Sequence, residues 1–141
     1  MLSFVQILPA ATIITAIITI FLSCGLATYM DHVPMYPQIS MCGMFVPERY
    51  VFSLGLNLVS FLIACLLFLN FCRSESQTLG RKNLSAVFAG IHLGIGISSS
   101  ICLALMATVP VSEYPVAHVL FAVAFFILII VYQVVLSIFF L

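Results

Sequence analysis

The sequence has very little charge. Only 6% of its 141 residues are Asp, Glu, Lys or Arg, whereas a soluble domain carries roughly 25%. Hydrophobic residues make up 65% of the chain, and the net charge is zero. A water-exposed surface this apolar would associate with itself, because large exposed apolar patches seek a partner. The composition therefore excludes a soluble globular protein, and the zero net charge gives no reason to expect a nucleic-acid partner.

The sequence also lacks the patterns of metal, disulfide and catalytic sites. None of its five cysteines forms a C-x-x-C pair, and Cys42 is alone in its polar loop. The other cysteines lie in or beside apolar runs, where a cysteine is usually a small buried hydrophobic residue. There is no nucleophile elbow, H-E-x-x-H or phosphate loop. We therefore expect no structural disulfide, no metal, no cofactor, no catalytic residue and no enzymatic activity.

What the sequence does have is four long apolar runs. A helix needs about 20 apolar residues to cross roughly 30 Å of hydrocarbon, and a spanning segment must satisfy its own backbone hydrogen bonds. The sequence therefore predicts an all-α membrane protein, a four transmembrane helix bundle that forms one domain over residues 1–141. The expected helices are about 7–29, 51–71, 85–109 and 116–140. The first run is too long for a signal peptide, so we expect it to be retained.

The few basic residues predict the orientation. Arg73, Arg81 and Lys82 fall in the second loop, whereas the first loop holds only Arg49 and the third loop has no basic residue. Positively charged residues stay on the cytoplasmic side. We therefore expect the second loop and both termini to be cytoplasmic. The first and third loops should face the lumen or the exterior.

The third run contains small residues at helical spacing. Gly90, Gly94 and Ser98 share one helix face, and small residues let two helices approach closely. We expect this face to pack within the chain, with homo-oligomer formation as the alternative. A neighbouring face repeats the spacing with Gly96, Ser100 and Ala104.

Polar side chains are rare inside the expected spans, and none is a carboxylate. This absence weakens a proton-coupled transporter, because intramembrane charges usually mark proton and ion pathways. A polar groove lined by Asn57, His92 and His118 would instead favour a lipid-handling protein.

The first loop is rich in conformationally special residues. Pro fixes φ and Gly permits positive φ, so the loop is expected to be rigid and folded. We expect Glu48 at the N-terminus of the second helix, where the helix dipole favours an anion. It should pair with Arg49, His32 or backbone N–H groups. The special residues are Pro34, Pro37, Gly43 and Pro47.

The stretch 31–58 resembles the signature of the DRAM (damage-regulated autophagy modulator) family. The superfamily includes the Frag and Sfk-type proteins and the N-terminal domain of fungal GPI-anchor and cell-wall remodelling proteins. Those relatives have six helices, so the resemblance implies that this chain holds the first four. The sequence departs from the pattern at Met41, Val46 and Val119. The matching positions are His32, Pro37, Ile39, Ser40, Gly43, Pro47, Glu48, Phe52, Asn57 and His118.

The resemblance implies a multi-pass protein of the lysosome, another endomembrane or the plasma membrane. We expect a non-enzymatic regulator or scaffold that acts in autophagy or membrane lipid organisation. Its expected partners are membrane lipids and other membrane proteins. The alternative is a lipid-handling protein: a scramblase, a transporter or a GPI-lipid remodelling factor. A tetraspanin- or claudin-like adhesion protein would need paired loop cysteines, which this chain lacks.

Overall fold

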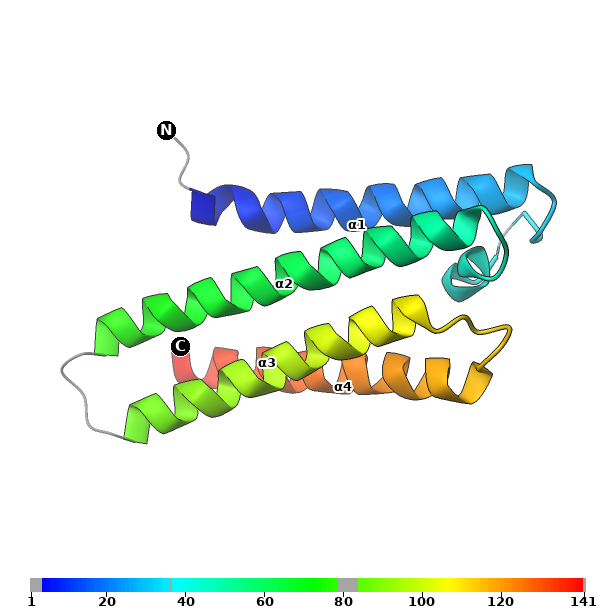
Figure 1. The fold of residues 1–141 in the computed structure, drawn as a ribbon. Coiled ribbons are helices and arrows are strands. Elements are labelled where there is room, and N and C mark those ends of the chain that lie inside the picture. Colours follow the sequence, from blue (N-terminus) through cyan, green and yellow to red (C-terminus); the bar gives the residue numbers. More distant parts are fainter. Residues whose placement is uncertain (1–3, 36, 79–83, 141) are drawn as a thin grey trace.

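Four long helices form the molecule (Figure 1). The computed structural model describes residues 4–35, 37–78 and 84–140. A short 3-10 helix, η1 (Ile39–Gly43), lies between the first two long helices, and the described residues contain no strand. Each long helix is long and apolar enough to cross a membrane, which confirms the expected all-α membrane fold. The long helices are α1 (Phe4–Tyr29), α2 (Glu48–Thr78), α3 (Leu84–Thr108) and α4 (Pro115–Phe140).

The main difference from the expected boundaries is in α2. The other three helices begin and end within three residues of their expected limits, whereas α2 runs to Thr78 instead of ending near residue 71. Its apolar span ends at Arg73, so the last turn continues into polar sequence. A helix satisfies its own backbone groups and need not stop where the hydrocarbon ends. The predicted second loop therefore begins as helix, and its residues 79–83 lie outside the described part of the chain.

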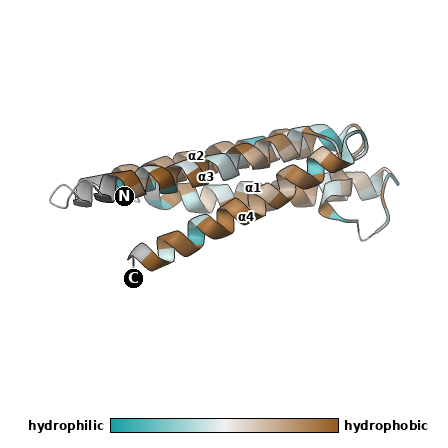
Figure 2. Ribbon diagram, turned by 90° about the horizontal axis from the view of Figure 1, so that it is seen from below, coloured by the Kyte–Doolittle hydropathy of each residue, from teal (hydrophilic) through white to brown (hydrophobic). Residues whose placement is uncertain are grey.

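The helices form an open row rather than a closed bundle. α2 packs along α1 and α3, and α3 packs along α4. Within the described chain, α1 and α4 share no comparable contact. Figure 2 shows α4 as a largely hydrophobic helix that diverges from the others toward its C-terminal end. The predicted number of membrane-spanning helices is therefore correct, and the outermost helix is the most exposed, since only 6% of the α4 span is buried.

Two glycines set the close approaches between helices. Gly55 in α2 lies against Thr19 of α1, and a Cβ at Gly55 would collide with the Thr19 side chain. A Cβ at Gly96 in α3 would lie 2.9 Å from Leu67 Cδ1 and 3.0 Å from Tyr132 Cδ2. Small residues allow this proximity, which helix association in membranes requires.

Two serines add a reciprocal contact between α2 and α3. The Ser60 hydroxyl donates to the Ser100 carbonyl at 2.6 Å, and the Ser100 hydroxyl donates to the Ser60 carbonyl at 3.1 Å. Both side chains are buried. Each hydroxyl is therefore satisfied by the other helix, away from water.

The expected packing face of α3 does not pack against the described part of the chain. A Cβ on Gly90 or Gly94 would meet no described atom within 4 Å, and Ser98 on the same face is exposed. The buried face is the neighbouring one, which carries Gly96 and Ser100. The spacing of small residues identifies helix faces that allow close approach, but it does not show which face the neighbouring helix contacts. The prediction therefore chose the wrong face of α3. Self-association through the exposed face stays a prediction.

Candidate functional site

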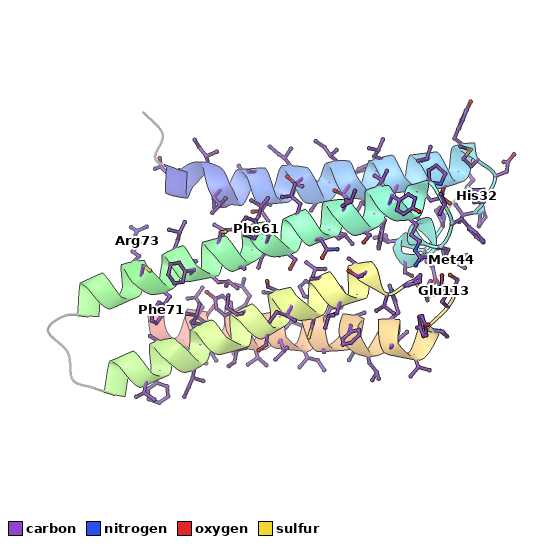
Figure 3. All side chains as sticks on the ribbon, in the orientation of Figure 1. His32, Met44, Phe61, Phe71, Arg73 and Glu113 are labelled. Atoms are coloured by element: carbon purple, nitrogen blue, oxygen red, sulfur yellow. The ribbon has the colours of Figure 1, made fainter. Side chains whose placement is uncertain are left out.

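The first and third loops meet at one end of the molecule. Figure 3 shows His32, Met44 and Glu113 together at this end, and Arg73 at the opposite end. We call this region the end cap. It comprises residues 30–47 and 109–114 together with the helix ends that flank these two loops.

A tight turn at Asp31 ends α1 and positions His32. Asp31 has φ 56°, in the left-handed region, which Asp tolerates better than most residues. The His32 N–H donates to the Ala27 carbonyl at 3.0 Å, and the Asp31 N–H donates to the Thr28 carbonyl at 3.1 Å. These paired bonds form a Schellman motif, a common helix C-terminus. The turn places the His32 ring next to the start of α2.

Glu48 is the first residue of α2 and is fully buried. Its Oε1 lies 2.6 Å from Nδ1 of His32, whose side chain is 33% exposed. Its Oε2 has no hydrogen-bond partner among the described groups. Burying a charge is costly unless the charge is paired. Of the partners expected for Glu48, His32 is therefore the one that lets this carboxylate lie inside the end cap.

Cys42 lies beside this pair in a small apolar cluster. It is fully buried with Ala27 and Val33, and Cys24 of α1 packs against the same cluster. Burial raises the pKa of Cys42 to about 12, and the neighbouring Cys24 and Glu48 shift the pKa in the same direction. The Cys42 thiol therefore stays protonated at physiological pH.

Gly43 provides space for the ring of Phe52. A Cβ on Gly43 would lie 2.6 Å from the Phe52 Cδ1 atom. Phe52 is buried with Leu56 and Ala107, so the ring joins the end cap to the packing of α2 on α3. Gly43 therefore serves the loop through its lack of a side chain rather than through a positive φ, which no described glycine has.

An ion pair joins the start of α2 to the third loop. The Arg49 Nη1 atom donates to Oε1 of Glu113 at 2.7 Å. The two side chains are 32% and 52% exposed, so water screens the attraction. The sequence analysis singled out Arg49 but not Glu113. The predicted topology was the available signal, since it already placed both loops on the same side of the membrane.

The sequence matches one known family along nearly its whole length. The match is to the Frag1/DRAM/Sfk1/Cwh43P N-terminal domain, over residues 4–141. The chain belongs to this family. The resemblance noted in the sequence is thereby confirmed, and family membership agrees with a multi-pass membrane protein. No curated protein and no solved structure matches the chain.

Two signature positions of this Frag1/DRAM chain bond to groups near the ends of the helices. The Asn57 amide donates to the Ser53 carbonyl at 2.8 Å and to Oγ1 of Thr108, the last residue of α3, at 3.2 Å. The buried His118 donates from Nδ1 to the Val109 carbonyl at 2.7 Å, which ties the start of α4 to the third loop.

The polar groove considered from the sequence is not assembled in this Frag1/DRAM chain. His92 stacks on Tyr132 with a ring separation of 3.9 Å, and its Nε2 donates to the Tyr132 carbonyl at 3.0 Å. His92 lies about 24 Å along α3 from Thr108, the partner of Asn57, at roughly 1.5 Å per residue. Asn57, His92 and His118 therefore serve three separate contacts.

The remaining signature positions shape the first loop. Pro37 precedes η1, Ile39 and Ser40 begin it, and Pro47 follows it directly before α2. The Val46–Pro47 peptide bond is cis. The first-loop signature of the Frag1/DRAM family thus builds the part of the end cap that brings His32 to Glu48.

Proposed function

We propose that this member of the Frag1/DRAM family is a non-enzymatic regulator or scaffold of a lysosomal or other endomembrane. The proposed roles are in autophagy or in membrane lipid organisation. The observation that carries the proposal is the end cap, where the His32–Glu48 pair ties the first loop to the start of α2 and the Arg49–Glu113 pair ties the third loop to the same helix end. A surface held in one shape loses little conformational entropy when it binds, which suits recognition of another protein.

The exposed apolar helix faces favour the proposal that membrane lipids and other membrane proteins are the partners of this chain. α4 packs only against α3 among the major helix contacts, and most of its surface is apolar and exposed. In a bilayer such faces contact acyl chains or pack against a second set of helices. Exposed apolar residues along α4 include Val116, Leu120, Val123, Ile127 and Ile130.

The proposal places the end cap on the lumenal side and the α2–α3 connection in the cytoplasm. Figure 1 shows the beginning of α1 and the end of α4 at the same end of the molecule as the end of α2 and the beginning of α3. In a cysteine-free background, an impermeant thiol reagent in the cytosol should label Ser76→Cys and spare Gln38→Cys. The reverse labelling pattern would overturn the orientation.

Photo-crosslinking tests the scaffold role. Met35 and Tyr114 are exposed on the end cap, whereas Phe126 is exposed in the middle of α4. A photoreactive residue at either end-cap position should give protein adducts of defined mass, and the Phe126 control should give mainly lipid adducts. Purified protein in liposomes should move or hydrolyse fluorescent lipids no faster than empty liposomes. Clear flipping or hydrolysis would contradict the scaffold role.

A lipid-handling function is the second candidate, and the buried Glu48 carboxylate favours it. Its Oε2 is unpartnered among the described groups, and Oε1 contacts the partly exposed His32. A carboxylate beside an imidazole can transfer protons to or from a reacting group. Under this alternative, Glu48→Gln abolishes lipid chemistry while folding and localisation persist. Under the scaffold proposal the same change perturbs folding or trafficking, and no turnover depends on it.

A further inference from the structure

The fold brings together two cysteines from different elements of the end cap. Cys42 in η1 is buried with Ala27 of α1, and Cys24 packs against this cluster one turn earlier in the helix. α1 and η1 pack directly on each other, and this packing brings the Cys24 side chain against the cluster that holds Cys42. The sequence analysis looked for a partner of Cys42 within the loop, but the partner lies in the preceding helix.

We propose that Cys24 and Cys42 form an intramolecular disulfide in the mature protein. The proposal rests on the lumenal placement of the end cap, because disulfides form and persist in oxidising compartments. The bond would fasten η1 to α1 and so brace the segment that carries His32 to Glu48. The other cysteines, Cys65, Cys72 and Cys102, lie in α2 and α3, outside the end cap.

The bond forms by exchange with an external disulfide, such as oxidised glutathione or a protein disulfide of the lumen. Cys24 is the more exposed thiol, so its thiolate attacks the external disulfide, which releases one thiolate that takes up a proton. Cys42 then loses its proton and attacks the Cys24 sulfur of the mixed disulfide. The second external thiol leaves and is protonated. The two protein thiols are oxidised by two electrons, and one external disulfide is reduced to two thiols.

The surroundings of Cys42 make the bond slow to form in the folded protein and slow to break. Its raised pKa leaves little thiolate for the second attack, so closure is fastest while the end cap is still folding. Reduction from the exposed side must expel Cys42, and a thiol of high pKa is a poor leaving group. Attack on the Cys42 sulfur itself is blocked, because this side chain is fully buried. These properties suit a structural bond rather than a reversible switch.

Thiol trapping and peptide mapping test the proposal on the full chain. Cells are lysed with excess N-ethylmaleimide, and the purified protein is digested without reductant and mapped by mass spectrometry. We expect a linked Cys24–Cys42 peptide that disappears with dithiothreitol, and maleimide on Cys65, Cys72 and Cys102. Cys24→Ser should remove the linked peptide, and the matched control Cys102→Ser should keep it. Maleimide on all five cysteines of the wild-type protein would overturn the proposal.

Two further measurements separate the disulfide from the orientation on which it rests. Reduction of the purified protein should lower its thermal midpoint by about 5–15 °C in detergent, and Cys24→Ser should show no such response. The reduced protein is also refolded with oxidised glutathione. A bond that forms there but never in cells would overturn the lumenal placement together with the cellular disulfide. A bond that forms in neither case, while the Gln38→Cys label proves lumenal, would overturn the disulfide alone.

Discussion

The end cap and the membrane-spanning part are held together by different interactions. The end cap uses two pairs of ionisable side chains, His32 with Glu48 and Arg49 with Glu113. The spanning part uses small residues at close approaches, chiefly Gly55 against Thr19, and buried hydroxyls that bond across helices. The end cap therefore relies on a few specific polar contacts, whereas the membrane-spanning part relies on close packing along the length of the helices.

The difference follows from the two solvents. The end cap lies near water, so a polar side chain there can be partly exposed, as the His32 side chain is at 33%, while its partner Glu48 is buried. The spanning helices gain no hydrophobic stabilisation from meeting each other in lipid, so they depend on close van der Waals packing. Changes in the end cap should therefore act through charge and hydrogen bonding, and changes in the spans through volume.

The largest expected effect comes from His32→Ala in the end cap. It leaves Glu48 fully buried without its partner, and breaking a buried pair from one side destabilises by about 3–5 kcal/mol. Glu48→Gln removes the charge and keeps the shape, so its effect should be smaller, about 1–3 kcal/mol. Thermal unfolding in detergent, followed by circular dichroism, measures both. A larger loss for Glu48→Gln than for His32→Ala would show that the pair does not compensate a buried charge.

The second effect tests volume in the spans. Gly55→Leu should destabilise by about 1–3 kcal/mol, because its side chain enters the space that Thr19 occupies. Gly90→Leu is the matched control, since a side chain there meets no described atom within 4 Å and should leave the thermal midpoint within 1–2 °C of wild type. A control variant that unfolds as early as Gly55→Leu would place the Gly90 face in a contact, such as a homo-oligomer.

Hydrophobic length and charge were sufficient to predict the four helices, because the bilayer leaves few alternatives for an apolar run of this length. The contacts were harder to predict. The residue spacing favoured the α3 face that carries Gly94, but that face meets no described atom within 4 Å of a Cβ at Gly94. The face that packs against neighbouring helices carries Gly96. Helix periodicity repeats on every face, so it does not fix the rotation of a helix about its axis.

The sequence predicted the location of the candidate site, because the family signature lies in the first loop, but it predicted few of the contacts within the end cap. A local partner for Glu48 was expected, either Arg49, His32 or backbone N–H groups, and the structure shows that it is His32. The contacts of Cys42 with Cys24 and of Arg49 with Glu113 were missed. They depend on how the first loop folds back on α1 and on how far the third loop reaches. Local sequence does not determine either distance.

The third effect is the loss of a hydroxyl bond between spans. Ser60→Ala removes its hydrogen bond to the Ser100 carbonyl, and such bonds between membrane helices contribute about 0.6 kcal/mol on average. The Ser60→Ala/Ser100→Ala double variant should lose less than the sum of the two single variants, because the two hydroxyls also contact each other at 3.5 Å and either single variant already removes that contact. Ser98→Ala on the exposed face is the control. Strictly additive losses in the double-mutant cycle would contradict a coupled contact.

The smallest loss of stability is expected at the ion pair between the start of α2 and the third loop. Arg49→Glu places two carboxylates near each other, but both positions are partly exposed, so the loss should stay below about 1 kcal/mol. The exchange variant Arg49→Glu/Glu113→Arg should recover most of that loss, and Glu113→Gln should lie between them. In 1 M salt, where the screening length falls to about 3 Å, the variants should converge in thermal midpoint. Differences in thermal midpoint that persist at high salt would mean that Arg49 stabilises the end cap through packing of its aliphatic side-chain carbons rather than through its charge. In that case the end cap would depend on packing, as the membrane-spanning helices do.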